Sequence, residues 1–171
     1  MAINADSAAD FANNITAQIG NPHTTGAFTP DIQFTTKGKD VPDKITSIGL
    51  TVATAITKVR FGMGRPDAKN RAATDEMVTA IADHEGKHRQ IFEATAAAAL
   101  TAAQRFVGTG NTTAANKALT TDLKCAANKQ HEALDAQEGL LSVDAGLKVT
   151  KKASGAKYPC PAAAASGPKK P

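Results

Sequence analysis

The residues with the clearest chemical potential form one short run, His84-Glu85-Gly86-Lys87-His88. Two histidines four positions apart on a helix point the same way, one turn apart, so both imidazoles can bind one metal ion. The glutamate between them points to the side, where it can take a proton from a metal-activated water. The spacing therefore predicts a Zn²⁺ site, with His84 and His88 as ligands and Glu85 as general base.

A catalytic zinc ion needs a third protein ligand, which we expect from a second helix. If the first helix ends near 107 and the second begins near 112, antiparallel pairing places His88 opposite His131. The same count places His84 opposite Asp135. We expect His131 to bind the metal and Asp135 to orient an imidazole. The reverse assignment, with Asp135 or Glu138 as the ligand, stays open, and so does a merely solvated helix flank.

Two long helices are expected to carry these residues, over 75–106 and 113–143. The first has an apolar stripe that includes Met77, Ile81 and Phe92, on the same face as the two histidines. This face turns inward, and buried imidazoles need polar partners, either a metal ion or neighbouring polar side chains. The short loop between the helices predicts an antiparallel hairpin.

The segment before the motif is predicted to form strands at 31–36 and 45–61, after a short helix near 7–19 and a loop over 21–30. Side chains alternate over 45–61, and the apolar phase shifts by one residue after Lys58, which indicates a bulge or a new strand. The predicted fold is α+β, with a small twisted β-sheet packed on a long HExxH helix. That helix pairs with a second long antiparallel helix.

The chain of 171 residues fits one domain over 1–154, followed by a flexible Pro/Ala/Lys tail over 155–171. Tyr158 lies in this tail and is a weaker candidate, as an oxyanion donor. Cys125 and Cys160 form no CxxC motif, so we expect no thiolate zinc site. A disulfide between them would tie the tail to the outer face of the second helix. Free thiols are the alternative, and the redox compartment decides.

The net charge of +4 is concentrated near the C-terminal end, without interleaved aromatic residues or a nucleic-acid motif. We therefore expect no nucleic-acid partner. No apolar run reaches the ~18 residues of a membrane span, and the first ten residues do not read as a signal peptide. We expect a cytoplasmic protein, with export by an unrecognised route left open. The sequence indicates no oligomeric state.

The chain resembles zincin metallopeptidases in its strand at 45–61, followed by a helix with His84-Glu85-x-x-His88. Over about 30–145 it is similar to an uncharacterised bacterial domain family of predicted zinc-dependent proteases, which has strands, an HExxH helix and a Cys-containing helix. The resemblance implies zinc on His84 and His88, with Glu85 as general base. It also implies that the strand around 48–56 holds an extended peptide substrate by β-addition.

The sequence departs from this family pattern in two ways. Lys87 and Arg89 are charged where zincins prefer uncharged residues, and the longer HExxHxxGxxH pattern is missing. In the Glu-ligand branch of zincins, a later helix carries the third ligand and an Asp four residues on. His131 and Asp135 match that spacing with a different ligand type.

Two other classes of function fit the same residues. Four ligands at 84, 88, 131 and 135 would close the coordination sphere of a structural zinc ion without turnover. The second class is a helical interaction module without metal, in which the histidines are ordinary core residues. Catalysis requires an open position on the metal, which neither of these has.

Overall fold

The structure is a computed structural model that describes residues 2–19, 24–38, 42–57, 60–61 and 67–161. It has the expected α+β fold, with small sheets packed on a long helix that pairs with a second helix. The elements are β1 (Ala2–Ile3), α1 (Ala8–Ile19), β2 (Thr24–Thr36), β3 (Pro42–Ile56), β4 (Arg60–Phe61), α2 (Ala68–Ala103), η1 (Gln104–Phe106), α3 (Thr112–Lys117), η2 (Ala118–Asp122), α4 (Leu123–Glu138), β5 (Leu140–Val143) and β6 (Val149–Lys152).

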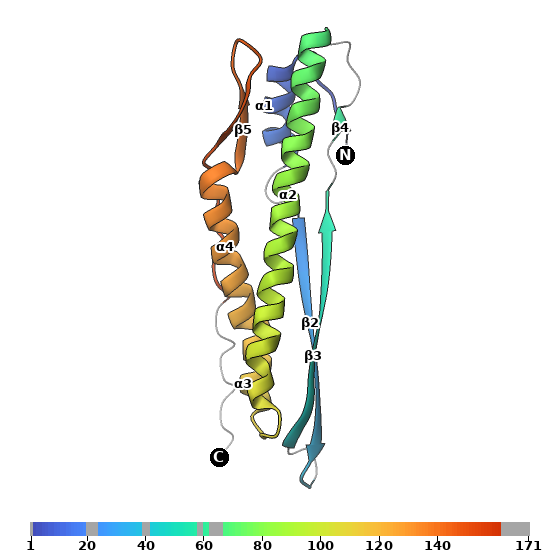
Figure 1. The fold of residues 1–171 in the computed structure, drawn as a ribbon, viewed down its shortest axis with the longest axis vertical. Helices are drawn as coiled ribbons and strands as arrows, with labels where there is room; N and C mark the ends of the chain where they lie inside the picture. Colours follow the sequence, from blue (N-terminus) through green and yellow to red (C-terminus); the bar gives the residue numbers. More distant parts are fainter. Residues whose placement is uncertain (1, 20–23, 39–41, 58–59, 62–66, 162–171) are drawn as a thin grey trace.

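Helix α2 is the spine of an elongated molecule (Figure 1). The β2–β3 hairpin runs along one side of it, and α3, η2 and α4 return along the other side. The Asp67 carboxylate caps α2 by accepting a hydrogen bond from the backbone N–H of Asn70, at 2.8 Å. At the far end, Gly108 turns the chain with a φ of 86°, a value that suits glycine. The predicted antiparallel hairpin of helices is therefore confirmed.

The β2–β3 hairpin corrects the loop predicted over 21–30, because β2 already begins at Thr24. Pro30 pairs with Leu50 in a sheet of two strands, where an outward N–H position tolerates proline. Gly26 lies against Phe92 of α2, and a Cβ at this position would come within 2.6 Å of the ring. Gly26 thus allows close packing of β2 on α2, and Pro30 is accommodated in a two-stranded sheet. Neither residue forms a turn here.

The remaining strands form two separate pairs. The phase shift after Lys58 marks a new strand, since β3 ends at Ile56 and β4 pairs in parallel with β1. Residues 58 and 59 themselves lie outside the described part. The second long helix ends at Glu138, five residues before its predicted end at 143, and the chain continues into the β5–β6 hairpin. In Figure 1, β5 lies beside α1.

Two apolar clusters pack against α2, near its two ends. One surrounds Phe11 of α1 and Met77, and the other joins β3, Ala103 and Leu119. Met77 and Ala103 are 26 residues apart, which is about 39 Å along a helix. The buried residues of α2 between them include the polar side chains of Glu85, His88 and Thr95. Polar contacts therefore join α2 to its neighbours at this level, next to the buried apolar side chains of Ala96, Leu123 and Ala127.

The described part of the predicted tail, 155–161, lies along α4, and Cys160 forms a disulfide with Cys125. Residues 162–171 lie outside the described part, so the flexible tail stays a prediction. Within the described ranges, no helix is both long and apolar enough to cross a lipid bilayer.

Replacing both cysteines, as C125S/C160S, is expected to lower the free energy of unfolding by about 3–4 kcal/mol. This is the loop-entropy value for cysteines separated by 35 residues. Urea denaturation of the oxidised wild type and the variant, followed by the helical circular dichroism signal, measures the difference. Equal midpoints and slopes would show that the crosslink does not stabilise the fold.

Candidate metal centre

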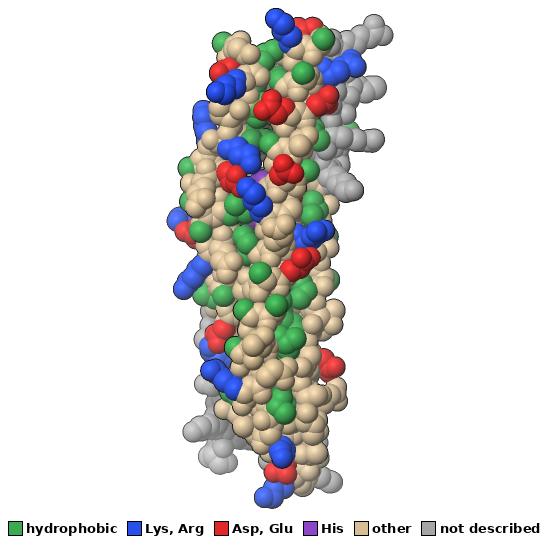
Figure 2. All heavy atoms as spheres, viewed as in Figure 1, with side chains coloured by type: hydrophobic (Ala, Val, Ile, Leu, Met, Phe, Trp, Pro, Cys, Tyr) green, Lys and Arg blue, Asp and Glu red, His purple; other side chains and the backbone are tan. Residues whose placement is uncertain are grey.

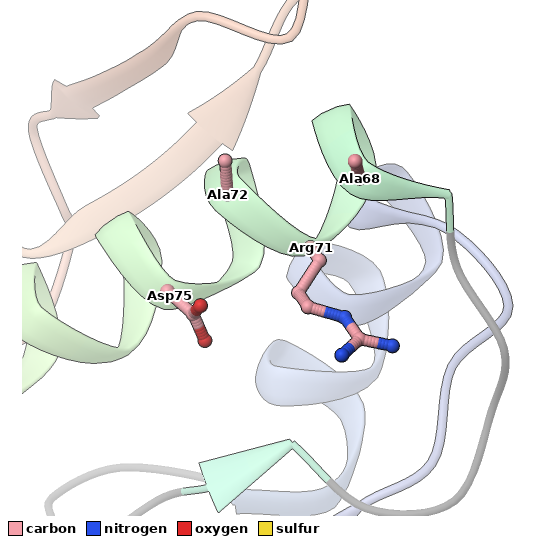
Figure 3. A pocket seen from close by; sticks show the side chains of 4 residues that line it. All are labelled: Ala68, Arg71, Ala72 and Asp75. Carbon is pink, nitrogen blue, oxygen red and sulfur yellow. The ribbon is translucent and has the colours of Figure 1, made fainter.

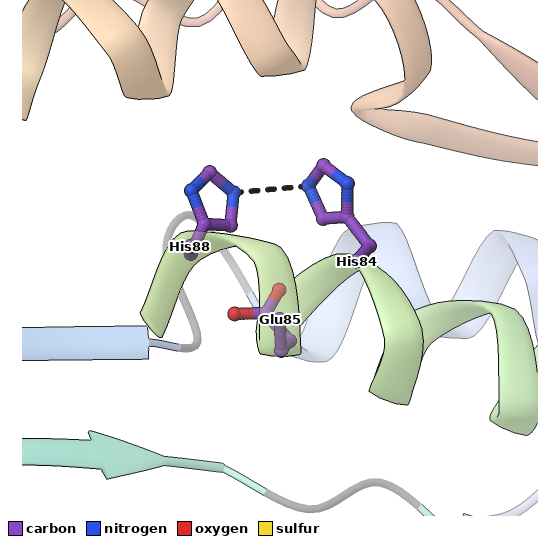
Figure 4. Close-up of side chains that lie close together, drawn as sticks. All are labelled: His84, Glu85 and His88. Carbon is purple, nitrogen blue, oxygen red and sulfur yellow. Dashed lines mark hydrogen bonds between the residues drawn. The ribbon is translucent and has the colours of Figure 1, made fainter. Parts of the chain in front are cut away.

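Three side chains from two helices meet at the middle of α2. The Nε2 atoms of His84 and His88 are 3.0 Å apart. The Oδ1 atom of Asp135, from α4, lies 3.0 Å from the first and 3.1 Å from the second. The pairing expected from the helical hairpin is therefore observed for His84 and Asp135. Figure 4 shows both imidazoles pointing from α2 towards the opposite helix.

Hydrogen bonds cannot account for all three contacts among the two Nε2 atoms and the Oδ1 atom. Each neutral imidazole carries one N–H, and an ionised carboxylate carries none. Three mutual contacts need three shared protons, whereas the two Nε2 atoms supply at most two. If both donate to Asp135, two N–H groups face each other across 3.0 Å. A cation among three lone pairs makes all three contacts attractive, so these residues fit a metal ion.

The spacing of the three atoms also fits zinc. Tetrahedral zinc sites have bonds of about 2.0–2.1 Å, which place neighbouring ligand atoms about 3.3 Å apart. The observed separations of 3.0 to 3.1 Å are close to that value. Imidazole nitrogen and carboxylate oxygen are both ordinary zinc ligands.

Glu85 is buried, and Figure 4 shows its side chain between the imidazoles and the strands. Its Oε2 atom lies 2.5 Å from the hydroxyl oxygen of Thr24, the first residue of β2. The hydroxyl donates to this carboxylate oxygen and holds the side chain in place. Ligand atoms of His84, Glu85 and His88 all lie within 4.8 Å of one another, so the group forms a candidate metal site on a long helix.

His131 contacts the other nitrogen of His88. Their Nδ1 atoms are 2.7 Å apart, and the ring of His131 packs 4.4 Å from that of Phe92, between centroids. His131 thus lies behind His88, on the side away from Asp135. Of the two assignments left open by the sequence, these contacts favour Asp135 at the metal and His131 as the residue that orients His88.

Burial favours the neutral form of His88 and His131. It lowers the pKa of His131 to about 4, and the neighbouring His88 acts in the same sense. Burial also lowers the pKa of His88, followed by the effect of His84. The Nε2 atom of His131 and the Nδ1 atom of His84 are buried without a hydrogen-bond partner in the described part of the chain. Neutral imidazoles are the form that binds a metal ion.

Glu138 lies at the outer edge of the site, with Oε1 3.8 Å from Nδ1 of His84. Lys87 and Lys151 both form ion pairs with this carboxylate. Hydrogen bonds from Lys87 and then Lys151 lower the pKa of Glu138 to about 2. In the space-filling view, only a small histidine surface appears, between basic and acidic side chains (Figure 2). This view shows the site covered by charged groups.

Tyr158 reaches the site from the segment after β6. Its hydroxyl donates to Oδ2 of Asp135, at 2.6 Å. Burial raises the pKa of Tyr158, and the hydrogen bond to Asp135 adds to this effect. The tyrosine is therefore a neutral hydrogen-bond donor at neutral pH. Thr24 is the site residue that sequence reasoning missed, and its 61-residue separation from Glu85 gave no signal.

A shallow pocket of 390 Å³ lies elsewhere, near the beginning of α2 (Figure 3). Arg71 and Asp75 line it together with two alanines. Asp75 is nine residues from His84, which is about 13 Å along the helix. Its lining contains none of the histidines, so this pocket does not form part of the candidate metal site.

No protein-family model, curated protein or solved structure matches this chain. The comparisons therefore assign no family. What the structure does show is His84, Glu85 and His88 together on a long helix, with the glutamate and the second histidine buried. This arrangement is similar to the HExxH motif of zincins.

The metal-free protein is expected to lose stability as the pH falls from about 7 to 4. The pKa of His131 is about 4 in the folded chain, against an ordinary value of 6.5. The unfolded chain therefore binds more protons in this window, and the free energy of unfolding falls. His88 contributes with the same sign, because its pKa is also lowered.

Urea denaturation in the presence of EDTA, at several values between about pH 8 and pH 4, measures this dependence. His131→Gln removes one of the titrating groups and should reduce the slope. The same slope in both proteins would contradict the assignment. Below about pH 4.5, Glu138 adds a further loss, because its pKa of about 2 lies below its ordinary value.

Proposed function

We propose that this protein is a zinc-dependent hydrolase that cleaves peptides or other amides, with His84, His88 and Asp135 as the metal ligands. The observation that carries the proposal is the triangle of Nε2, Nε2 and Oδ1 atoms at 3.0 to 3.1 Å. Three protein ligands leave the fourth position of a tetrahedral zinc ion for water, which is the arrangement of catalytic sites.

Neighbouring side chains would orient the ligands. With Nε2 of His88 on the metal, its Nδ1–H donates to Nδ1 of His131, 2.7 Å away. Glu138 faces Nδ1 of His84 at 3.8 Å, and a small movement of the carboxylate would form the equivalent hydrogen bond. Partners of this kind fix the tautomer and orientation of metal-binding imidazoles and raise metal affinity by about 10- to 100-fold.

Zinc held there would act as a Lewis acid and lower the pKa of a water towards 7. Glu85 would be the residue that accepts a proton from that water and donates it to the leaving amine. Thr24 holds the carboxylate in place through its hydroxyl. Burial of Glu85 excludes bulk water and strengthens each of these interactions.

For the substrate, we propose an extended peptide beside β3. In the described part of the chain, β3 pairs with no strand other than β2. The beginning of its other edge is hydrogen-bonded, at Ile45 and Ile48, to the turn after α2, so a peptide would add as a strand over 49–56. Ile56, the last residue of β3, pairs with Thr24, which touches Glu85. A peptide added to this edge would end beside Ile56, two strand spacings or about 10 Å from Thr24.

A structural zinc site without turnover is the second candidate. The observation in its favour is burial, since Glu85, His88, His131 and Asp135 are each 4% exposed. Such a site gives a substrate little access without movement of the surrounding chain. Metal content and turnover separate these two candidates.

The disulfide is evidence about the cellular compartment in which the protein works. Disulfides persist in oxidising compartments and are rare in the cytosol. The pairing of Cys125 with Cys160 therefore supports export by an unrecognised route, the alternative that the sequence left open, over the expected cytoplasmic location. We propose that the protein works outside the reducing cytosol.

Elemental analysis of protein purified without a metal-affinity tag is expected to find one zinc ion per chain. His84→Ala and Asp135→Ala should each lose it, because each variant removes one of the three ligands. His131→Gln should retain zinc with about 10- to 100-fold weaker affinity, since this residue acts through His88. Loss of zinc in His131→Gln, with retention in Asp135→Ala, would reverse the two roles.

Glu85→Gln is expected to retain the zinc ion and to lose amide hydrolysis by a factor of about 10²–10⁴, the usual contribution of a general base. The matched control is Asp83→Asn, an exposed carboxylate two positions away, which should keep full activity. A screen of peptide libraries with the wild type and both variants measures the effect. Equal hydrolysis by the wild type and Glu85→Gln would exclude Glu85 as the base, and zinc binding without any turnover would support the structural candidate.

A further inference from the structure

The chain after β6 returns along α4 without secondary structure of its own. Successive residues of this segment contact positions of α4 that lie progressively nearer to the beginning of the helix. The backbone N–H of Ser154 donates to the carbonyl of Asp135 at 2.7 Å, and Lys157 forms an ion pair with Glu132. Asn128 then donates to the carbonyl of Pro159, also at 2.7 Å. The segment 154–160 is therefore a strap that runs antiparallel to α4.

The strap places Tyr158 on Asp135. One carboxylate oxygen of Asp135 faces His84 and His88, and the other accepts the hydrogen bond from the Tyr158 hydroxyl, at 2.6 Å. A carboxylate bound at both oxygens cannot rotate about its terminal bond without losing one of its partners. Tyr158 therefore fixes the direction in which Asp135 presents its ligand atom.

The disulfide between Cys160 and Cys125 is the covalent anchor of the strap. Cys160 is two residues beyond Tyr158, and Cys125 lies ten residues before Asp135, almost three turns along the helix. The other contacts of the strap are single hydrogen bonds and an exposed ion pair. Ser154 bonds to Asp135, Asn128 bonds to Pro159, and Glu132 accepts from the backbone N–H of Tyr158 and pairs with Lys157. Each of these contacts can break by itself, whereas the crosslink fixes the chain covalently two residues from Tyr158.

We propose that Tyr158 is a positioning residue for Asp135, and that the Cys125–Cys160 disulfide holds it there, so that reduction of the disulfide weakens the metal centre. This inference rests on the proposed function, because it requires Asp135 to bind the metal. A dithiol reductant would supply two electrons and two protons. The S–S bond breaks, two thiols form on the protein, and the dithiol becomes a disulfide.

Four proteins test the proposal as a double-mutant cycle: the oxidised wild type, Tyr158→Phe, C125S/C160S, and the combination of all three changes. Zn²⁺ affinity is measured by competition with a chromophoric chelator, without a reductant that binds zinc. Tyr158→Phe and C125S/C160S should each weaken binding by about 10- to 100-fold. If the disulfide acts through Tyr158, the combined variant should bind no more weakly than C125S/C160S alone.

The visible absorption of Co²⁺ in the same four proteins reports ligand geometry, which a general loss of stability would not change. We expect the same altered spectrum in Tyr158→Phe and in C125S/C160S. Lys157→Gln, which breaks the exposed ion pair of the strap and leaves the bond between Glu132 and the backbone of Tyr158 in place, is the matched control and should keep the wild-type affinity and spectrum. Helical circular dichroism confirms that each variant is folded, and Tyr158→Phe tests the positioning role even if C125S/C160S does not fold.

Tyr158 also offers a signal that does not require metal, because the chain has one tyrosine and no tryptophan. Emission from a tyrosine hydrogen-bonded to a carboxylate is quenched. We therefore expect C125S/C160S to fluoresce more strongly than the oxidised wild type in EDTA. Unchanged emission would show that the disulfide does not hold Tyr158 on Asp135.

The outcomes distinguish a failure of the proposed zinc-binding function from a failure of the proposed role of Tyr158 and the disulfide. A wild-type protein that binds no zinc contradicts the proposed function. Zinc binding with the same affinity in all four proteins contradicts this inference alone. Additive losses in the combined variant would show that the disulfide acts on the site by a route other than Tyr158.

Discussion

The contact between the histidines of α2 and the polar residues of α4 is the constraint on which the middle of the molecule depends. Apolar clusters hold the two ends of α2, and the stretch between them is bridged by His84, His88, His131 and Asp135. Buried polar groups stabilise a fold only when each has a partner. A metal ion would supply the attraction that protons cannot provide for all three contacts at once, and so strengthen the contact between the two helices.

Much of this arrangement could be predicted because it follows from local periodicity. The i, i+4 spacing puts His84 and His88 on one face, and a short loop between long helices determines which residues of α4 lie opposite them. Which ring nitrogen of His88 faces His131 depends on side-chain rotamers, which spacing does not determine. The contact of Thr24 with Glu85 joins segments 61 residues apart, and only the packing of β2 on α2 creates it.

Charged side chains are distributed differently in the interior and at the outer edge of the site. Imidazoles and one carboxylate form its interior, whereas Lys87, Lys151 and Glu138 form an ion-pair network at its outer edge. Lys87 and Glu138 come from facing helices, and Lys151 comes from β6, so the network joins three elements over the site. The charged Lys87, which departs from the zincin pattern within the motif, therefore has a structural partner here.

The close approach of β2 to α2 has a mechanical consequence. Gly26 leaves no room for a side chain beside the ring of Phe92, and that ring packs on both Phe28 and His131. The base of the hairpin thus packs directly against the candidate metal site, whereas its tip lies about 30 Å further along the strands. Ile45 and Ile48 pack with Ala103 nearer that tip, so the hairpin is clamped on α2 at two points. Displacing it along α2 would shift the one phenyl ring that packs on the imidazole beside His88.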